Sequence, residues 1–201
     1  MITLVIGGAS SGKSALAESY VATLAPPVTY VATWVAPPGE PDAEMVERVA
    51  AHRRRRPASW GLVEVGLDLG AALRPLAGTV LVDALGTWVA GAAGLAVDVD
   101  VVSLCDVLGA REGDTVLVSD EVGLGVHPSS DAGRRFREVL GRVNEAVAAI
   151  ADDVWLVVAG RVLSLVPPPW APSPPQGPAA ARTGPGAPIV TPGVPTRGRS
   201  A

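Results

Sequence analysis

The chain has 201 residues, 48% hydrophobic but only 4% aromatic, so one α/β domain with a core of Val, Leu and Ala is expected. A single cysteine, Cys105, excludes an internal disulfide framework and favours a reducing compartment. Residues 1–166 hold 13 basic and 20 acidic side chains, a net charge of −7, which argues against nucleic acid as a partner. Because no signal peptide and no run of 18 apolar residues are found, we expect a cytoplasmic protein without membrane insertion.

The first fourteen residues contain the strongest motif. An apolar run at residues 2–6 predicts a strand, and it leads into Gly7-Gly-Ala-Ser-Ser-Gly-Lys-Ser14, which fits the P-loop pattern G-x-x-x-x-G-K-[ST]. Lys13, the only lysine in the chain, is expected to reach the β- and γ-phosphates, and the Ser14 hydroxyl to hold Mg²⁺. A glycine-rich turn without a ligand is the alternative. The residues expected to bind phosphates are Gly7, Gly8, Ala9, Ser10, Ser11, Gly12, Lys13 and Ser14.

Later segments alternate between strand and helix patterns. A helix is expected over about residues 13–24, and a second from an N-cap at Asp42 to the run Arg53-Arg-Arg-Arg-Pro57, where proline ends it. Apolar runs predict strands at 28–32, 62–65, 79–83, 114–118 and 154–158. Helices are expected at 67–76, 95–108 and 131–151, the last capped by Asp131. This order indicates an α/β fold with a mostly parallel sheet covered by helices on both faces.

Residues 167–201 have a different composition. They hold 11 of the 19 prolines, no acidic residue and no regular period. We therefore expect a single domain over residues 1–166 and a Pro-rich disordered tail over 167–201. A functionless extension is favoured over a Pro-rich ligand for a partner.

Two carboxylate positions follow apolar strands. Asp83 ends the strand at 79–83, where P-loop proteins place a carboxylate that binds Mg²⁺ directly or through water. Asp120-Glu121 follows the strand at 114–118 and is a second candidate. A solvated acid at the end of a strand is the alternative for both. Ser14 and Asp83 are the predicted metal ligands.

His52 and the four arginines that follow it form the second candidate centre. Read without other information, they are the solvated, polar end of a helix. Arginines attract phosphates, however, and nearby positive charge lowers the pKa of an imidazole, so that the neutral, nucleophilic form dominates at pH 7. Such a histidine could attack an α-phosphate and form a phosphoramidate while the arginines steady the departing pyrophosphate. The chemistry alone leaves both interpretations open. His127, the other histidine, is expected to be incidental.

These motifs resemble a known family, the bifunctional adenosylcobinamide kinase / adenosylcobinamide-phosphate guanylyltransferases of cobalamin biosynthesis, over about residues 1–166. Further matching segments are Tyr30-Val-Ala-Thr33, Leu81-Val-Asp83, Glu121-Val-Gly-Leu-Gly125 and Gly141-Arg-Val-Asn144. The resemblance implies a P-loop NTPase fold with a RecA-like sheet and a homotrimer. It implies two activities: phosphorylation of adenosylcobinamide, and transfer of GMP from GTP to the resulting phosphate through a guanylylated histidine, with release of pyrophosphate.

The resemblance also implies roles for single residues. The family's His-x-x-x-Arg-Pro motif falls on His52…Arg56-Pro57, which makes His52 the nucleophile. GTP and ATP are the expected substrates, with Mg²⁺ as cofactor. Besides the P-loop, the nucleotide is expected to contact Thr33, Trp34, Arg53, Arg54, Arg55, Arg56, Glu64 and Asp83.

Several positions depart from the family's pattern. The family commonly has Asn where Asp120 stands, Arg where Ser10 stands, and Thr where Gly86 stands. Asp120 matters most, since an added carboxylate near phosphates could alter metal binding. A P-loop GTP-binding switch, which changes partners rather than modifying a metabolite, is the rival interpretation.

Overall fold

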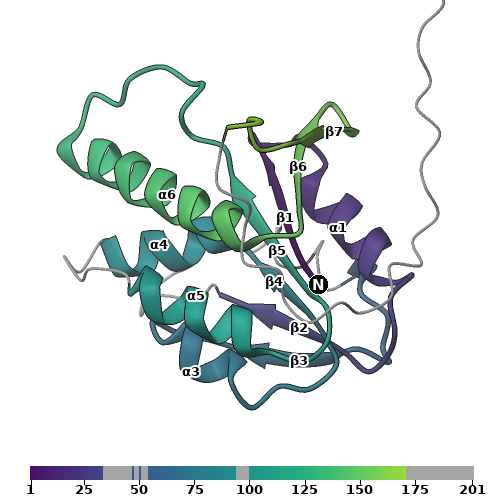
Figure 1. Ribbon diagram of the computed structural model, residues 1–201. Coiled ribbons are helices and arrows are strands. Elements are labelled where there is room, and N and C mark those ends of the chain that lie inside the picture. Colours follow the sequence, from purple (N-terminus) through teal and green to yellow (C-terminus); the bar gives the residue numbers. More distant parts are fainter. Residues whose placement is uncertain (34–46, 48–49, 51–53, 94–99, 171–201) are drawn as a thin grey trace, which may run out of the picture.

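Seven strands form one sheet with the order β3-β2-β4-β5-β1-β6-β7 (Figure 1). The computed structural model describes residues 1–33, 47, 50, 54–93 and 100–170. Neighbouring strands are parallel except for β6 and β7, which are antiparallel. The strands are β1 (Ile2–Gly7), β2 (Val28–Ala32), β3 (Gly61–Glu64), β4 (Thr79–Asp83), β5 (Thr115–Asp120), β6 (Asp153–Val158) and β7 (Arg161–Leu165).

Helices cover both faces of this sheet (Figure 1). One face packs against α1 (Lys13–Val21), which contacts β1, β4 and β5. The other face carries α3 (Leu69–Leu73), α4 (Leu85–Ala93), α5 (Val101–Ala110) and α6 (Asp131–Ile150). The expected α/β P-loop fold, with a mostly parallel sheet between helices, is confirmed.

Burial on both faces explains why the strands are apolar along their whole length. Successive side chains of a strand point to opposite faces. In β4, Val80 and Val82 belong to the core cluster beneath α3–α6, whereas Leu81 belongs to the cluster beneath α1. All three are fully buried. Water therefore reaches the sheet mainly at its edges and at the ends of its strands, and a ligand must bind there.

Two helix starts differ from the sequence prediction. Ser130, not Asp131, caps α6, and its Oγ accepts a hydrogen bond from the backbone N–H of Gly133 at 3.1 Å. Asp131 lies in the first turn, where a carboxylate is also stabilised by the positive end of the helix. Asp100 caps α5, which starts at Val101, whereas the predicted residues 95–99 lie outside the described part of the chain.

Two elements were absent from the prediction. The helix α4 contains two glycines and no charged residue, so it shows no polar face from which a helical period could be recognised. The strand β7 pairs with β6 through a tight turn in which Ala159 and Gly160 have φ angles of 50° and 71°. Positive φ at both turn residues is typical of a two-residue hairpin.

Other boundaries moved by one to several residues. The first helix ends at Val21 rather than near residue 24, β5 extends to Asp120, and the helix predicted at 67–76 shortens to α3. Of the helix predicted from Asp42, the described residues Glu47, Ala50, Arg54 and Arg55 are helical, and the helix ends before Pro57 as expected. Residues 42–46, 48, 49 and 51–53 of that helix, and residues 171–201 of the predicted tail, lie outside the described residues. Within the described part of the chain, no helix is long and apolar enough to cross a membrane.

Candidate active site

The P-loop connects the end of β1 to the start of α1. A Cβ atom on Gly7 would lie 2.6 Å from both Ser11 Oγ and the carbonyl oxygen of Val157, so only glycine fits there. Gly12, with a φ angle of 90°, is the N-cap of α1 and offers no side-chain cap to the first turn. Backbone N–H groups at such a helix start are suited to binding phosphate oxygens.

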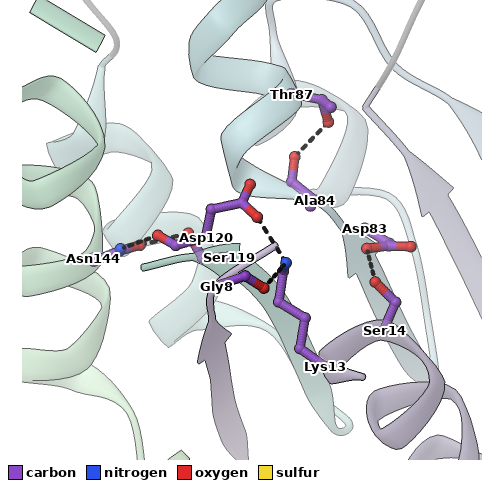
Figure 2. Close-up of polar contacts among 9 residues, drawn as sticks. All are labelled: Gly8, Lys13, Ser14, Asp83, Ala84, Thr87, Ser119, Asp120 and Asn144. Atoms are coloured by element: carbon purple, nitrogen blue, oxygen red, sulfur yellow. Dashed lines mark hydrogen bonds and ion pairs between the residues drawn. The ribbon is translucent and has the colours of Figure 1, made fainter. Parts of the chain in front are cut away.

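Lys13 is held at the centre of the site by two contacts (Figure 2). Its Nζ donates to the carbonyl oxygen of Gly8 at 3.1 Å and forms an ion pair with Asp120 Oδ1 at 2.7 Å. The Lys13 side chain is only 7% exposed. Asp120 reaches it because β5 pairs with β1 in a register that places Asp120 beside Gly7. A carboxylate thus occupies a position on the P-loop lysine that a nucleotide phosphate would need.

Gly86 at the start of α4 makes room for this carboxylate. A Cβ atom at position 86 would lie 2.1 Å from Asp120 Oδ2. Gly86 and Asp120 are two of the positions at which the sequence is expected to depart from the resembled family, and the structure places them close together. The absence of a side chain at 86 therefore accommodates the conformation in which Asp120 pairs with Lys13.

Ser14 and Asp83 lie on the other side of Lys13 (Figure 2). Ser14 Oγ donates to Asp83 Oδ1 at 3.2 Å, and the Tyr30 hydroxyl donates to Asp83 Oδ2 at 2.7 Å. Burial and the neighbouring Asp83 carboxylate strongly raise the pKa of Tyr30, so its phenol remains a donor. Hydroxyl and carboxylate oxygens suit Mg²⁺, which takes its remaining ligands from phosphates and water. Within the described residues, no group of three or more His, Cys, Asp or Glu side chains forms a metal cluster.

Thr33 braces the segment that follows Asp83. Its Oγ1 donates to the carbonyl oxygen of Ala84 at 2.6 Å and accepts from the Ala84 N–H at 3.1 Å. The Thr87 hydroxyl oxygen lies 2.6 Å from Thr33 Oγ1. Thr33 is only 4% exposed. The structure thus gives Thr33 a positioning role behind Asp83, and its direct contact with a nucleotide stays a prediction.

Two of the predicted arginines lie beside the P-loop helix. Arg55 forms a bidentate ion pair with Glu18 of α1, with distances of 2.8 and 3.2 Å. The guanidinium of Arg56 lies over the ring of Tyr30, 4.9 Å from its centroid. Arg54 pairs with Glu47 at 2.8 Å on the surface. The segment that follows His52 is therefore anchored to α1, which carries Ser14, and to Tyr30 of β2, which binds Asp83.

The remaining predicted residues lie farther from Asp83 or fall outside the described part of the chain. Glu64 ends β3 in register with Ala32, which is itself in register with Asp83 on the next strand. Two strand spacings separate Glu64 from Asp83, about 10 Å. Trp34, His52 and Arg53 lie outside the described residues, so their roles stay predictions.

Sequence reasoning missed two supports of the site. Tyr30 was recognised only as part of a matching segment, yet it orients Asp83. The backbone N–H of Gly160 donates to the carbonyl oxygen of Ser11 at 2.8 Å, so the β6–β7 turn holds the P-loop from outside. No local pattern marks such contacts, since they arise from strand order.

The family model for cobinamide kinase / cobinamide phosphate guanyltransferase matches residues 3–165. The chain belongs to this family. Curated relatives include the bifunctional adenosylcobalamin biosynthesis protein CobP of Pseudomonas aeruginosa, 39% identical over 82% of this chain and 97% of its own length. The CobU proteins of Salmonella typhimurium and Escherichia coli are 37% and 35% identical over 80% of this chain and 97% of theirs. The family predicted from the motifs is confirmed.

A type III secretion system ATPase of pathogenic bacteria is the subject of one similar solved structure. It aligns with a TM-score of 0.49 and 14% identity over 81% of this chain and 56% of the other. This similarity does not establish the fold. The P-loop fold of this cobinamide kinase family member follows from its own strand order and from the loop between β1 and α1.

Proposed function

We propose that this chain phosphorylates adenosylcobinamide with a nucleoside triphosphate and then transfers GMP from GTP to adenosylcobinamide phosphate. The products are adenosylcobinamide-GDP and pyrophosphate. The observation that carries the proposal is the convergence of Lys13, Ser14 and Asp83 on one P-loop in a member of this family. The relatives at 35–39% identity are bifunctional adenosylcobalamin biosynthesis proteins by name.

In the first reaction, the acceptor hydroxyl attacks the γ-phosphorus, the bond to the β–γ bridging oxygen breaks, and the hydroxyl proton passes to water. Lys13 stabilises the charge on the phosphoryl oxygens. Ser14 and Asp83 would hold Mg²⁺, which would supply positive charge against the phosphates. Tyr30 keeps Asp83 oriented by donating a hydrogen bond to its carboxylate.

In the second reaction, His52 attacks the α-phosphorus of GTP and pyrophosphate leaves, which gives a histidine–GMP phosphoramidate. The phosphate of the acceptor then attacks the same phosphorus and frees the histidine. The described arginines support this assignment, because Arg55 and Arg56 fix the segment after His52 against α1 and β2. Cationic guanidinium groups near this position suit a pyrophosphate leaving group.

We further propose a homotrimer in the cytoplasm that uses GTP or ATP for the kinase step. Residues 1–166 would form its single domain, and residues 167–201 a disordered tail. Light scattering of the purified chain measures the assembly, and a mass of one or two chains would contradict the trimer.

The decisive experiment incubates the protein with adenosylcobinamide and GTP and separates the products by mass. Labelling with α-phosphate-labelled GTP alone then tests the nucleophile. His52→Asn should abolish an acid-labile, alkali-stable label, and His127→Asn is the matched control that should retain it. Persistent labelling of the His52 variant would move the nucleophile elsewhere. GTP binding with neither product nor label would favour a regulatory switch.

A further inference from the structure

A cavity of about 600 Å³ lies between α6 and the segment that connects β5 to α6. Ile6, Glu121 and Asn144 line it, and these residues adjoin the P-loop site. Ile6 precedes Gly7, and Glu121 follows Asp120. We name this space the α6 cavity. Figure 1 shows the connecting segment running from the carboxyl end of β5 to the start of α6.

The α6 cavity adjoins the phosphate site on the side away from the predicted metal ligands. Asn144 Nδ2 donates to the backbone oxygen of Asp120 at 3.0 Å, and Asn144 Oδ1 accepts from Ser119 Oγ at 2.6 Å. In Figure 2, Asp120 and Asn144 lie on one side of the Lys13 ammonium, and Ser14 with Asp83 lies on the other. If the metal-binding phosphates of a nucleotide lie beside Ser14 and Asp83, the α6 cavity is on the opposite side of these phosphates. A second substrate can then reach the phosphates from the cavity.

Hydrogen bonds of charged side chains hold the segment between β5 and α6, which forms one wall of the cavity. The guanidinium of Arg134 donates to the carbonyl oxygens of Pro128 and Ser129 at 3.0 and 2.9 Å. Arg137 donates to the carbonyl oxygen of Gly123 at 2.9 Å. The Glu121 carboxylate accepts from the N–H groups of Gly123 and Leu124 at 2.9 and 3.0 Å. Arg134 and Arg137 therefore tie α6 to the connecting segment across the cavity.

The charge of the wall suits a polar, largely uncharged ligand. The charged residues that line the cavity balance in sign: Glu121, Glu138 and Glu145 against Arg134, Arg137 and Arg142. Carboxylates repel a polyphosphate but accept hydrogen bonds from amide N–H groups, and a guanidinium binds a phosphate. A triphosphate is a poor match for such a wall, whereas an amide-bearing ligand that carries a hydroxyl or a single phosphate is a good one.

We propose that the α6 cavity is the acceptor subsite, which receives the hydroxyl-bearing arm of cobinamide and the amide groups around it. This inference rests on the proposed function, because it assigns the second substrate of the same site. The acceptor hydroxyl then approaches the phosphate held by Lys13 from the side of Asn144. The nucleotide remains on the side of Ser14 and Asp83.

A steric block provides the test. Gly141 lies on the exposed face of α6 and lines the cavity, and a Cβ atom there meets nothing within 4 Å. A Cβ atom at position 141 is therefore unhindered, so the large side chain of Gly141→Trp has room to start into the cavity, and replacement of a helical glycine favours the helix. Gly109→Trp on α5 is the matched control, because Gly109 is also exposed with nothing within 4 Å and does not line the cavity.

Equilibrium dialysis measures adenosylcobinamide binding directly, and titration measures GTP binding. Gly141→Trp should weaken adenosylcobinamide binding at least about 10-fold and leave GTP affinity and covalent labelling by GTP unchanged. Arg142→Gln should weaken binding of adenosylcobinamide phosphate more than that of adenosylcobinamide. Unchanged adenosylcobinamide binding in Gly141→Trp would overturn the acceptor subsite. Absence of adenosylcobinamide binding by the unaltered protein would instead overturn the proposed function.

Discussion

The ion pair between Lys13 and Asp120 makes nucleotide affinity dependent on a carboxylate that Asn would replace almost isosterically. A phosphate oxygen bound to Lys13 Nζ would lie about 5 Å from the Asp120 carboxylate, given the geometry of hydrogen bonds. Two unit charges at that distance repel by about 3 kcal/mol at an effective dielectric constant of about 20. Asp120 is 30% exposed, so solvent reduces this to about 1–2 kcal/mol. Asp120→Asn should therefore bind GTP about 10-fold more tightly.

Isothermal titration of the unaltered protein and the Asn variant with GTP measures this difference, and it should shrink as salt is raised. Gly86→Ala is an independent perturbation, because its methyl group would displace the Asp120 carboxylate from Lys13. It should shift the affinity in the same direction, and the double variant should show little further gain because the two changes act on one contact. Equal or weaker GTP binding by Asp120→Asn would refute competition between Asp120 and the phosphates.

Three further predictions concern the core of the site and the tail. Lys13→Arg should lower the kinase rate about 100-fold or more, because a planar guanidinium cannot take the buried position of the ammonium; near-normal turnover would contradict this. Since burial and Asp83 raise the pKa of Tyr30 above its ordinary value of 10.0, the folded protein retains that proton where the unfolded chain loses it. The free energy of unfolding should fall as pH rises above about 10, and denaturant titrations of Tyr30→Phe should show a smaller fall. Truncation after Val166 should leave both activities and the melting temperature unchanged, whereas a fall of several degrees would show that the tail packs on the domain.

The central strands of the sheet could be predicted because each is marked by a short sequence pattern of its own. The strands at 28–32 and 79–83 have the predicted bounds, since buried parallel strands are short apolar runs between turns. The helix α4 could not be predicted from a period, because it is buried and lacks a polar face. The side chains of β7 are all exposed, so its sequence shows no alternation of apolar and polar residues. Its pairing with β6 therefore could not be predicted.

The candidate site divides in the same way. The P-loop and the family could be assigned from the sequence alone, because residues 7–14 act through their own backbone and their immediate neighbours. Only the tertiary structure shows that Asp120 neutralises Lys13, that Gly86 accommodates Asp120, and that Tyr30 orients Asp83. Ser14 and Asp83 are 69 residues apart in the sequence. Such contacts depend on sheet order and register, which place the ends of β1, β2, β4 and β5 side by side, and no single segment encodes that arrangement.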